Sequence, residues 1–258
     1  MAEWLNRQWR LAATGLCFAV FGLGGLVVRC VVYPALLLAI RHPQSRQLAA
    51  QSVIHHSLRW FVALMTGVGV LSYEVRGRER LQRRGLLILA NHPSLIDVVF
   101  LMSLTRRADC VVKSALTRNP FTRGPVLATG WVRNDGGAAM VDDCIASLRA
   151  GNNLIIFPEG TRTRPGQPLQ LQRGAANVAV RGGFALTPVV IHCQPPTLTK
   201  GEKWYHVPVR RPRFVIDVRP DVPVSDWVPA GTEDAMAVRQ LTQALSEYFS
   251  REIRRDGA

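Results

Sequence analysis

The chain is short of acidic residues. Asp and Glu together number 18 of 258 residues against 32 Lys and Arg, which gives a formal net charge of +14 at pH 7. This balance excludes an acidic or salt-adapted protein and favours partners that carry phosphate, either anionic lipids or nucleic acid. Charged residues make up only 19% of the chain and hydrophobic residues 48%. The chain is therefore too apolar for a disordered protein and too polar for a transporter with many spans, which points to a globular domain resting on a membrane.

Several motif classes are absent. The five cysteines are scattered, with no CxxC pair and no histidine nearby at zinc-binding spacing, so we interpret them as reduced thiols of a cytosolic compartment. We expect no metal site and no bound cofactor. The chain has no GxSxG nucleophile elbow, and its paired glycines lack the spacing of a dinucleotide fingerprint.

The N-terminal region has long uncharged stretches. Leu11–Val28 carries no charge, Arg29 interrupts the pattern, and Cys30–Ile40 is apolar again before a basic turn. A second amphipathic stretch runs over Gln51–Leu71. We predict that residues 1–71 form a helical hairpin that enters one leaflet of a bilayer. A cleaved signal peptide and a hairpin buried in a soluble core are the two alternatives.

From Ser72 onward, short β-like runs alternate with helical stretches, which is typical of an α/β domain. We predict that residues 72–258 form a mixed sheet flanked by helices. The expected strands are Tyr73–Arg76, Leu86–Ala90, Cys110–Val112, Trp131–Arg133, Leu154–Phe157, Ala185–Ile191 and Phe214–Val218. The expected helices are Leu95–Leu104, Ala138–Ala150, Gly174–Arg181 and Glu233–Ile253, with an ordered loop between Gln194 and Pro212.

A first polar cluster follows the strand Leu86–Ala90, in the run Asn91-His92-Pro93-Ser94-Leu95-Ile96-Asp97. Ligands of open sheets bind at strand ends. Ser94 suits a helix N-cap with Asp97 three residues on, and this capping explains Ser94 but not His92. The Asp97 carboxylate can accept the Nδ1 proton of His92 and leave Nε2 as a general base.

A second polar turn follows the strand Leu154–Phe157, in the run FPEGTRTRPG. Glu159 offers a carboxylate that can bind hydroxyl groups, and Arg162 offers a planar guanidinium suited to phosphate. The alternative is a turn rich in Pro and Gly that a salt bridge between Glu159 and Arg162 closes.

These residues carry a family resemblance. NHPSLID contains the His-x4-Asp pattern and FPEGTR the second signature of the glycerolipid acyltransferases, and the chain resembles the 1-acylglycerol-3-phosphate acyltransferases among them. Gly130–Arg133 is similar to the block with a phosphate-binding arginine, and Leu186–Val190 to the proline-containing fourth block. The resemblance spans residues 75–191. Departures from the pattern, Trp131-Val132-Arg133 in the second block and the stretch from Cys193 to Trp204 after the fourth, leave the acceptor open.

The resemblance implies transfer of a fatty acyl group from an acyl carrier protein or coenzyme A thioester to a lysophospholipid hydroxyl, with 1-acyl-sn-glycerol-3-phosphate as the expected acceptor and phosphatidic acid as the product. It implies that His92 is the general base and Asp97 its orienting partner. The residues expected to bind substrate are Lys113, Arg133, Glu159, Gly160, Thr161 and Arg162. The expected location is the cytoplasmic face of the inner membrane, against anionic lipid and without nucleic acid.

Two other functions are considered. The same chemistry can act on another lysophospholipid, an ornithine-type lipid or a specialised lipid. A non-enzymatic protein that binds nucleic acid or membrane through basic side chains is disfavoured, because aromatic residues make up only 7% of the chain and no recognisable nucleic-acid module is present. The basic side chains concerned are Arg210, Arg211, Arg213, Arg251, Arg254 and Arg255.

Overall fold

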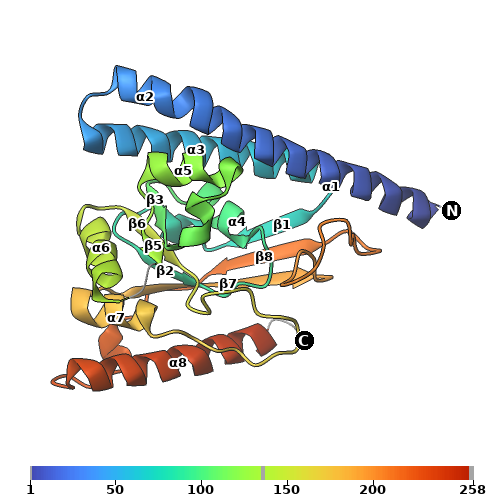
Figure 1. Cartoon of the computed structure of the whole chain (residues 1–258). Coiled ribbons are helices and arrows are strands. Elements are labelled where there is room, and N and C mark those ends of the chain that lie inside the picture. The colour runs from blue at the N-terminus through green and yellow to red at the C-terminus, as the bar shows by residue number, and fades with distance from the viewer. Residues whose placement is uncertain (1, 135–136, 256–258) are drawn as a thin grey trace.

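The computed structural model describes residues 2–134 and 137–255 and contains a six-stranded sheet in the order β1-β8-β7-β2-β6-β3 (Figure 1). Neighbouring strands run parallel except for the antiparallel pair of β7 and β8, so the predicted mixed sheet is confirmed. The strands are β1 (Ser72–Arg76), β2 (Leu87–Ala90), β3 (Ala108–Cys110), β6 (Asn153–Ile156), β7 (Leu186–Gln194) and β8 (Arg213–Val218).

The central strands are buried along their length. Every residue of β2 and β6 is buried, as are the first six residues of β7, because helices cover both faces of the sheet. On one face lie α3 (Pro43–Gly67) and α4 (Asp97–Leu104). On the other lie α6 (Ala138–Arg149), α7 (Gly174–Gly182) and α8 (Asp234–Arg255), as Figure 1 shows.

The N-terminal segment is a helical hairpin, as predicted. Its first arm is one continuous rod made of α1 (Ala2–Val27), a π-helical turn η1 (Val28–Val32) and α2 (Tyr33–Ala39), and α3 returns alongside it (Figure 1). Arg29, which interrupts the uncharged stretch in the sequence, lies inside the π turn and does not break the rod. Residues 3–39 are long and apolar enough to cross a membrane by length and composition.

The hairpin packs closely on the rest of the chain through α5 (Pro120–Thr129), which the sequence did not predict. Pro125 and Gly124 inside this helix are residues that break helices, which explains the omission. A Cβ on Gly25 of α1 would lie 1.9 Å from the carbonyl oxygen of Phe121, and one on Gly124 would lie 2.5 Å from Cβ of Arg29. The glycines therefore permit the two helices to touch backbone to backbone. The division at residue 71 into two domains stays a prediction, since hairpin and sheet residues share one hydrophobic core.

Other boundaries differ from the predictions. The expected strand Cys110–Val112 is split between β3 and β4 (Val112–Lys113), and the strand expected at Trp131–Arg133 lies at β5 (Arg133–Asn134), which pairs with β4. Helix α4 begins at Asp97 rather than Leu95, so Ser94 lies before the N-cap residue Ile96 and is not itself the N-cap. Residues 195–212, the β7–β8 loop, contain no helix or strand, as expected. Three short 3₁₀ helices complete the description, η2 (Arg78–Leu81), η3 (Ser114–Thr117) and η4 (Val224–Asp226).

Candidate active site

Polar residues gather at the carboxyl ends of β2 and β6, neighbouring strands in the centre of the sheet. Asn91 directly follows β2 and is tied to β7: its Nδ2 donates to the carbonyl oxygen of Ile191 at 2.8 Å, and its Oδ1 accepts from the Ile191 amide at 2.7 Å. These two bonds anchor the end of β2 to β7. The backbone position from which the following residues, His92 among them, leave the sheet is therefore fixed.

His92 and Asp97 form the pair that the sequence predicts. His92 Nδ1 lies 2.9 Å from Asp97 Oδ2, and the side chain of His92 is 17% exposed while that of Asp97 is fully buried. The imidazole stacks on the ring of Phe157, with 4.2 Å between ring centroids and 26° between ring planes. The contacts fix the ring from its edge and its face, and no partner for Nε2 is recorded among the described residues. Nε2 is therefore the ring nitrogen available to a substrate.

The Asp97 carboxylate is held in an apolar surrounding. Oδ2 also accepts a hydrogen bond from the Ser94 amide at 2.7 Å, whereas Oδ1 is buried without a partner in the described part of the chain. Burial raises the pKa of Asp97 above its ordinary value of 3.8, opposed by the hydrogen bond from His92 and by the charge of Arg162. A poorly solvated carboxylate interacts strongly with a positive charge on the ring beside it. The site is thus suited to stabilising His92 once it has taken a proton.

Glu159 lies beside the histidine turn rather than in open solvent. Its Oε1 accepts the backbone amide of His92 at 2.7 Å, and its Oε2 accepts the hydroxyl of Thr163. Burial raises the pKa of Glu159, opposed by these two hydrogen bonds. Both oxygens that the sequence assigns to substrate hydroxyls already have partners inside the chain. The described contacts of Glu159 join the turn after β6 to the turn after β2.

Arg162 reaches the β7–β8 loop. Its Nη1 donates to the carbonyl oxygens of Leu198 at 2.8 Å and Thr199 at 3.0 Å. The salt bridge between Glu159 and Arg162 that was the alternative interpretation is not among the ion pairs recorded for the described residues. Between these two residues, Gly160 adopts the left-handed conformation, with φ of +66°, that lets the turn close, and Thr161 is half-buried.

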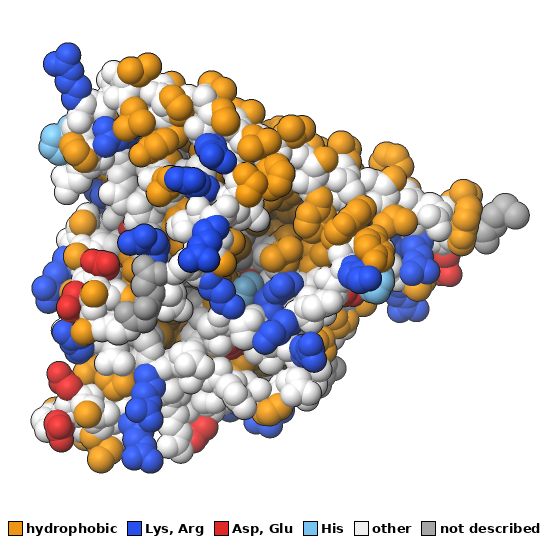
Figure 2. All heavy atoms as spheres, viewed as in Figure 1, with side chains coloured by type: hydrophobic (Ala, Val, Ile, Leu, Met, Phe, Trp, Pro, Cys, Tyr) orange, Lys and Arg blue, Asp and Glu red, His pale blue; other side chains and the backbone are white. Residues whose placement is uncertain are grey.

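Lys113 and Arg133 lie on the two strands of the small β4–β5 ladder. Val112 pairs with Arg133 and Lys113 with Asn134, and both basic side chains are exposed. Strand β4 closely follows β3, whose carboxyl end lies at the same edge of the sheet as those of β2 and β6. The β4–β5 ladder therefore continues the chain from the sheet edge at which β2 and β6 also end, and a role for its two cations in the site stays a prediction. Figure 2 shows Lys and Arg side chains around a hollow on this side of the molecule, below a surface of hydrophobic side chains.

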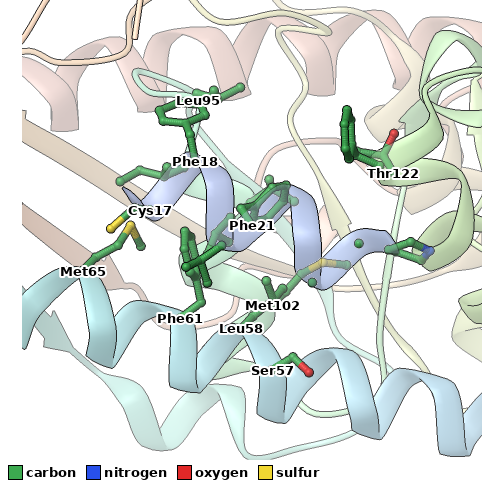
Figure 3. Close-up of a pocket in the computed structure, with 18 of the residues that line it drawn as sticks. Cys17, Phe18, Phe21, Ser57, Leu58, Phe61, Met65, Leu95, Met102 and Thr122 are labelled. Carbon is green, nitrogen blue, oxygen red and sulfur yellow. The ribbon is translucent and has the colours of Figure 1, made fainter. Parts of the chain in front are cut away.

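A large apolar cavity of about 910 Å³ opens beside the turn that follows β2 and carries His92, where Leu95 and Ile96 line it. Its walls come from α1, α3, α4, α5 and the β7–β8 loop. Figure 3 shows Phe21 of α1 beside Phe61 of α3, and Phe18 on the side of Leu95. The lining residues from Thr14 to Val32 extend over 19 residues of the first arm, about 27 Å from first to last at 1.5 Å rise per residue. One leaflet of a bilayer core is about 15 Å thick. The cavity is thus long enough for a lipid chain.

Sequence reasoning assigned no role to several residues of this site. Phe157 stacks on His92, Thr163 bonds Glu159, and Asn91 fixes the end of β2. Phe157 and Asn91 lie inside the two motifs, so their positions were a usable signal. The bonds from Ser94 and Arg162 to the β7–β8 loop join residues more than 35 positions apart and had no local signal.

Comparison with known proteins agrees with the geometry. The sequence profile of the Acyltransferase family matches residues 72–192. A 1-acyl-sn-glycerol-3-phosphate acyltransferase of Pseudomonas aeruginosa is 29% identical over 151 residues, covering 53% of this chain and 56% of that protein. The human 1-acyl-sn-glycerol-3-phosphate acyltransferase beta is 30% identical over 190 residues, covering 68% of this chain and 60% of that protein. The chain spans about half the length of other curated relatives that it matches.

The fold has a solved counterpart. The crystal structure of PlsC, the 1-acyl-sn-glycerophosphate acyltransferase of Thermotoga maritima, superposes with a TM-score of 0.71 at 19% identity and covers 96% of this chain and 98% of its own. The hairpin and the mixed sheet are thus found together in another protein. With a match to the Acyltransferase family over residues 72–192 and relatives named 1-acyl-sn-glycerol-3-phosphate acyltransferases, the chain belongs to the glycerolipid acyltransferase family.

Proposed function

We propose that the protein transfers a fatty acyl group from a thioester to the free hydroxyl of 1-acyl-sn-glycerol-3-phosphate, giving phosphatidic acid. The observation that carries this proposal is the bond of 2.9 Å between His92 Nδ1 and Asp97 Oδ2, in a turn whose next residues, Leu95 and Ile96, line a long apolar cavity. The donor is an acyl carrier protein or coenzyme A thioester, as the sequence resemblance implies.

The reaction needs a base that takes the proton of the acceptor hydroxyl and then returns it to the leaving thiolate. His92 Nε2 takes the proton of the acceptor hydroxyl while its oxygen attacks the thioester carbonyl carbon. The tetrahedral intermediate then collapses, the bond from carbon to sulfur breaks, and the imidazolium returns its proton to the leaving thiolate. Asp97 stabilises the imidazolium between these steps, and Glu159 keeps the His92 backbone in place.

The apolar cavity is the place for the donor chain. Leu95 and Ile96 of the catalytic turn lie in its wall, so a chain in the cavity holds its thioester next to His92. The acceptor then approaches from the side of the basic residues at the sheet edge. Its phosphate is bound by Lys113 and Arg133, with the charge of Arg162 nearby.

The proposal is tested with a panel of acceptors. Purified protein in detergent micelles is incubated with a labelled hexadecanoyl thioester, on coenzyme A and on acyl carrier protein, and products are identified by mass spectrometry. The acceptors are 1-acyl-sn-glycerol-3-phosphate, 1-acylglycerol without phosphate, and lysophosphatidylcholine. Phosphatidic acid is the expected main product. Equal or greater transfer to the acceptor without phosphate would reject the proposed acceptor.

Removing either basic residue at the sheet edge should weaken phosphate binding. We expect Arg133→Ala and Lys113→Ala each to raise the KM for 1-acyl-sn-glycerol-3-phosphate about tenfold with little change in kcat, because a charged hydrogen bond is worth about 1.5–3 kcal/mol and solvent reduces that value. Transfer to 1-acylglycerol should not change. Arg239→Ala on α8 is the matched control. If kcat falls instead of KM rising, the two residues do not bind the acceptor.

We also propose that the hairpin rests on the cytoplasmic face of the inner membrane, in contact with anionic lipid. Large hydrophobic side chains lie exposed along its first arm, where water alone would leave them unfavourably solvated. Figure 2 shows hydrophobic side chains along this upper surface, and the net charge of +14 adds attraction to anionic head groups. The exposed hydrophobic residues of the first arm are Trp4, Leu5, Trp9, Leu16, Phe21, Leu23, Val27, Val31, Leu37 and Leu38.

Acidic charges on this surface should strongly weaken vesicle binding. We expect the triple variant Leu16→Asp, Val31→Asp and Leu38→Asp to bind vesicles of equimolar phosphatidylcholine and phosphatidylglycerol about a hundredfold more weakly, since each side chain loses about 1 kcal/mol of burial in lipid. The control places the same three charges on α8 at Met236, Gln240 and Gln243. Sedimentation with vesicles measures both. Equal binding of the two variants would contradict this orientation.

A further inference from the structure

Leu198, in the β7–β8 loop, has an unusual backbone conformation. Its φ is +52°, in the left-handed region that residues with a side chain rarely adopt. Among the described residues other than glycine, only Arg107 shares a positive φ. Such conformations persist only where the surroundings hold them, and they cluster at functional sites.

The turn of His92, which follows β2, and the turn of Glu159, which follows β6, both hold this backbone conformation through hydrogen bonds. The carbonyl oxygen of Leu198 accepts from the Leu95 amide at 3.1 Å and from Arg162 Nη1 at 2.8 Å. The residue before it is also held, because the Ser94 hydroxyl donates to the carbonyl oxygen of Thr197 at 2.9 Å. Ser94 and Leu95 belong to the turn of His92, and Arg162 belongs to the turn of Glu159. The loop is thus clamped from both sides at one point.

The residue after Leu198 is fixed as well. Thr199 accepts the second hydrogen bond from Arg162 Nη1 at 3.0 Å, and its amide donates to the carboxylate of Glu202 at 2.9 Å. Three successive carbonyl groups, from residue 197 to residue 199, therefore accept bonds from the catalytic turns. Because these hydrogen bonds fix the backbone on both sides of Leu198, they also fix the direction in which its side chain leaves the backbone.

That direction is into the apolar cavity. The Leu198 side chain is half-buried, packs against the hydrophobic core and lines the cavity together with Leu95 and Ile96. These two residues follow His92 by three and four positions, so this part of the wall is the part next to the reacting thioester. Leu198 lies outside the matched family segment, which ends at residue 192.

We infer that Leu198 is a specificity-determining residue that selects the acyl chain by its first carbons, and that Arg162 is a positioning residue that holds Leu198 there. This inference rests on the proposed acyl transfer. A leucine against the first carbons leaves room for a straight chain and rejects a methyl branch beside the carbonyl. It does not sense the far end of the chain, which lies deeper along α1 and α3.

The test compares two donors on the same carrier, hexadecanoyl and 2-methylhexadecanoyl thioester, by their kcat/KM values. We expect the native protein to prefer the straight chain by at least about tenfold, because one methylene in an apolar pocket discriminates about 10–200-fold. In Leu198→Gly and Leu198→Ala the preference should fall to about threefold or less. Leu127→Ala, which removes an exposed leucine of α5 outside the cavity wall, is the matched control and should keep the native preference.

The Leu198→Gly variant is included because glycine adopts a positive φ without strain, so the loop can keep its backbone conformation when the side chain is removed. If Leu198→Ala does not fold, Leu198→Gly still reports the preference. Arg162→Met should lower the preference as Leu198→Gly does, and Arg162→Lys should restore part of it, since an ammonium group can still donate to one of the two carbonyl groups. A residue that only stabilised the fold would change both donors equally.

The outcomes separate this inference from the function it rests on. No transfer of the straight chain to any acceptor by the native protein would overturn both. Transfer without discrimination between the two donors, or discrimination that survives in both Leu198 variants, would overturn the inference and leave the proposed function standing. A loss of discrimination in Leu127→Ala as well would also overturn it.

Discussion

Replacing His92 with alanine should lower kcat for acyl transfer by about 10²–10⁴-fold, the usual contribution of a positioned base. The loss should appear in kcat, because the donor chain contacts the cavity wall and the acceptor phosphate contacts basic residues, none of which is changed. The fold should survive the substitution. The backbone amide of His92, which donates to Glu159 Oε1, is present in both proteins and still holds the turn.

The control is His42→Ala, which removes an exposed histidine from the turn between α2 and α3. It should keep activity within about twofold of the native protein, because surface substitutions away from a site have small effects. Far-UV circular dichroism and thermal unfolding are measured for both variants. A folded His92→Ala protein that works within a few-fold of the native rate would remove His92 from the mechanism.

The sequence predicts the sheet well because its central strands are buried. Strand β2 is wholly apolar, β6 is apolar after Asn153, and both end in polar turns that locate the site. Helix α5 was not predicted, because Pro125 and Gly124 disfavour a helix locally. Its close contact with α1 stabilises the helix in the folded chain. Local preference predicts an element where tertiary packing agrees with it and fails where packing overrides it.

The contacts of the site also fall into those that sequence spacing predicts and those that only the folded chain forms. The pairing of His92 with Asp97 follows from a separation of five residues across one turn, so spacing alone predicts it. The partners of Arg162 are 36 and 37 residues away, and only the folded chain brings them together. Glu159 shows the same limit, because its sequence neighbours do not reveal that the His92 amide occupies one of its oxygens.

Replacing Asp97 with asparagine should separate activity from stability. The amide oxygen can take the place of Oδ2 and still accept from the Ser94 amide and from His92 Nδ1, so the ring keeps its orientation. A neutral amide does not stabilise the imidazolium that forms when the base takes a proton. We expect kcat to fall by about 10²–10⁴-fold, as it does when other orienting carboxylates of histidine bases are neutralised.

The same change should raise stability at neutral pH. Burial raises the pKa of Asp97, so its contribution to the free energy of unfolding is fully present below its ordinary value of 3.8 and is lost as the pH rises through the folded value. Asparagine does not ionise, so the variant does not lose this free energy of unfolding as the pH rises. Its melting temperature should therefore exceed the native one by about 2–4 °C for each kcal/mol recovered, and the difference should shrink as the pH falls towards 4.

Both readouts come from one pair of proteins, assayed for transfer and melted across the pH range. An inactive variant that melts above the native protein at neutral pH means that the buried carboxylate is maintained for its charge, at the expense of stability. An inactive variant that melts below it would mean that Asp97 supports the fold and acts on catalysis only through it. Unchanged activity would exclude a role for the carboxylate charge in the transfer.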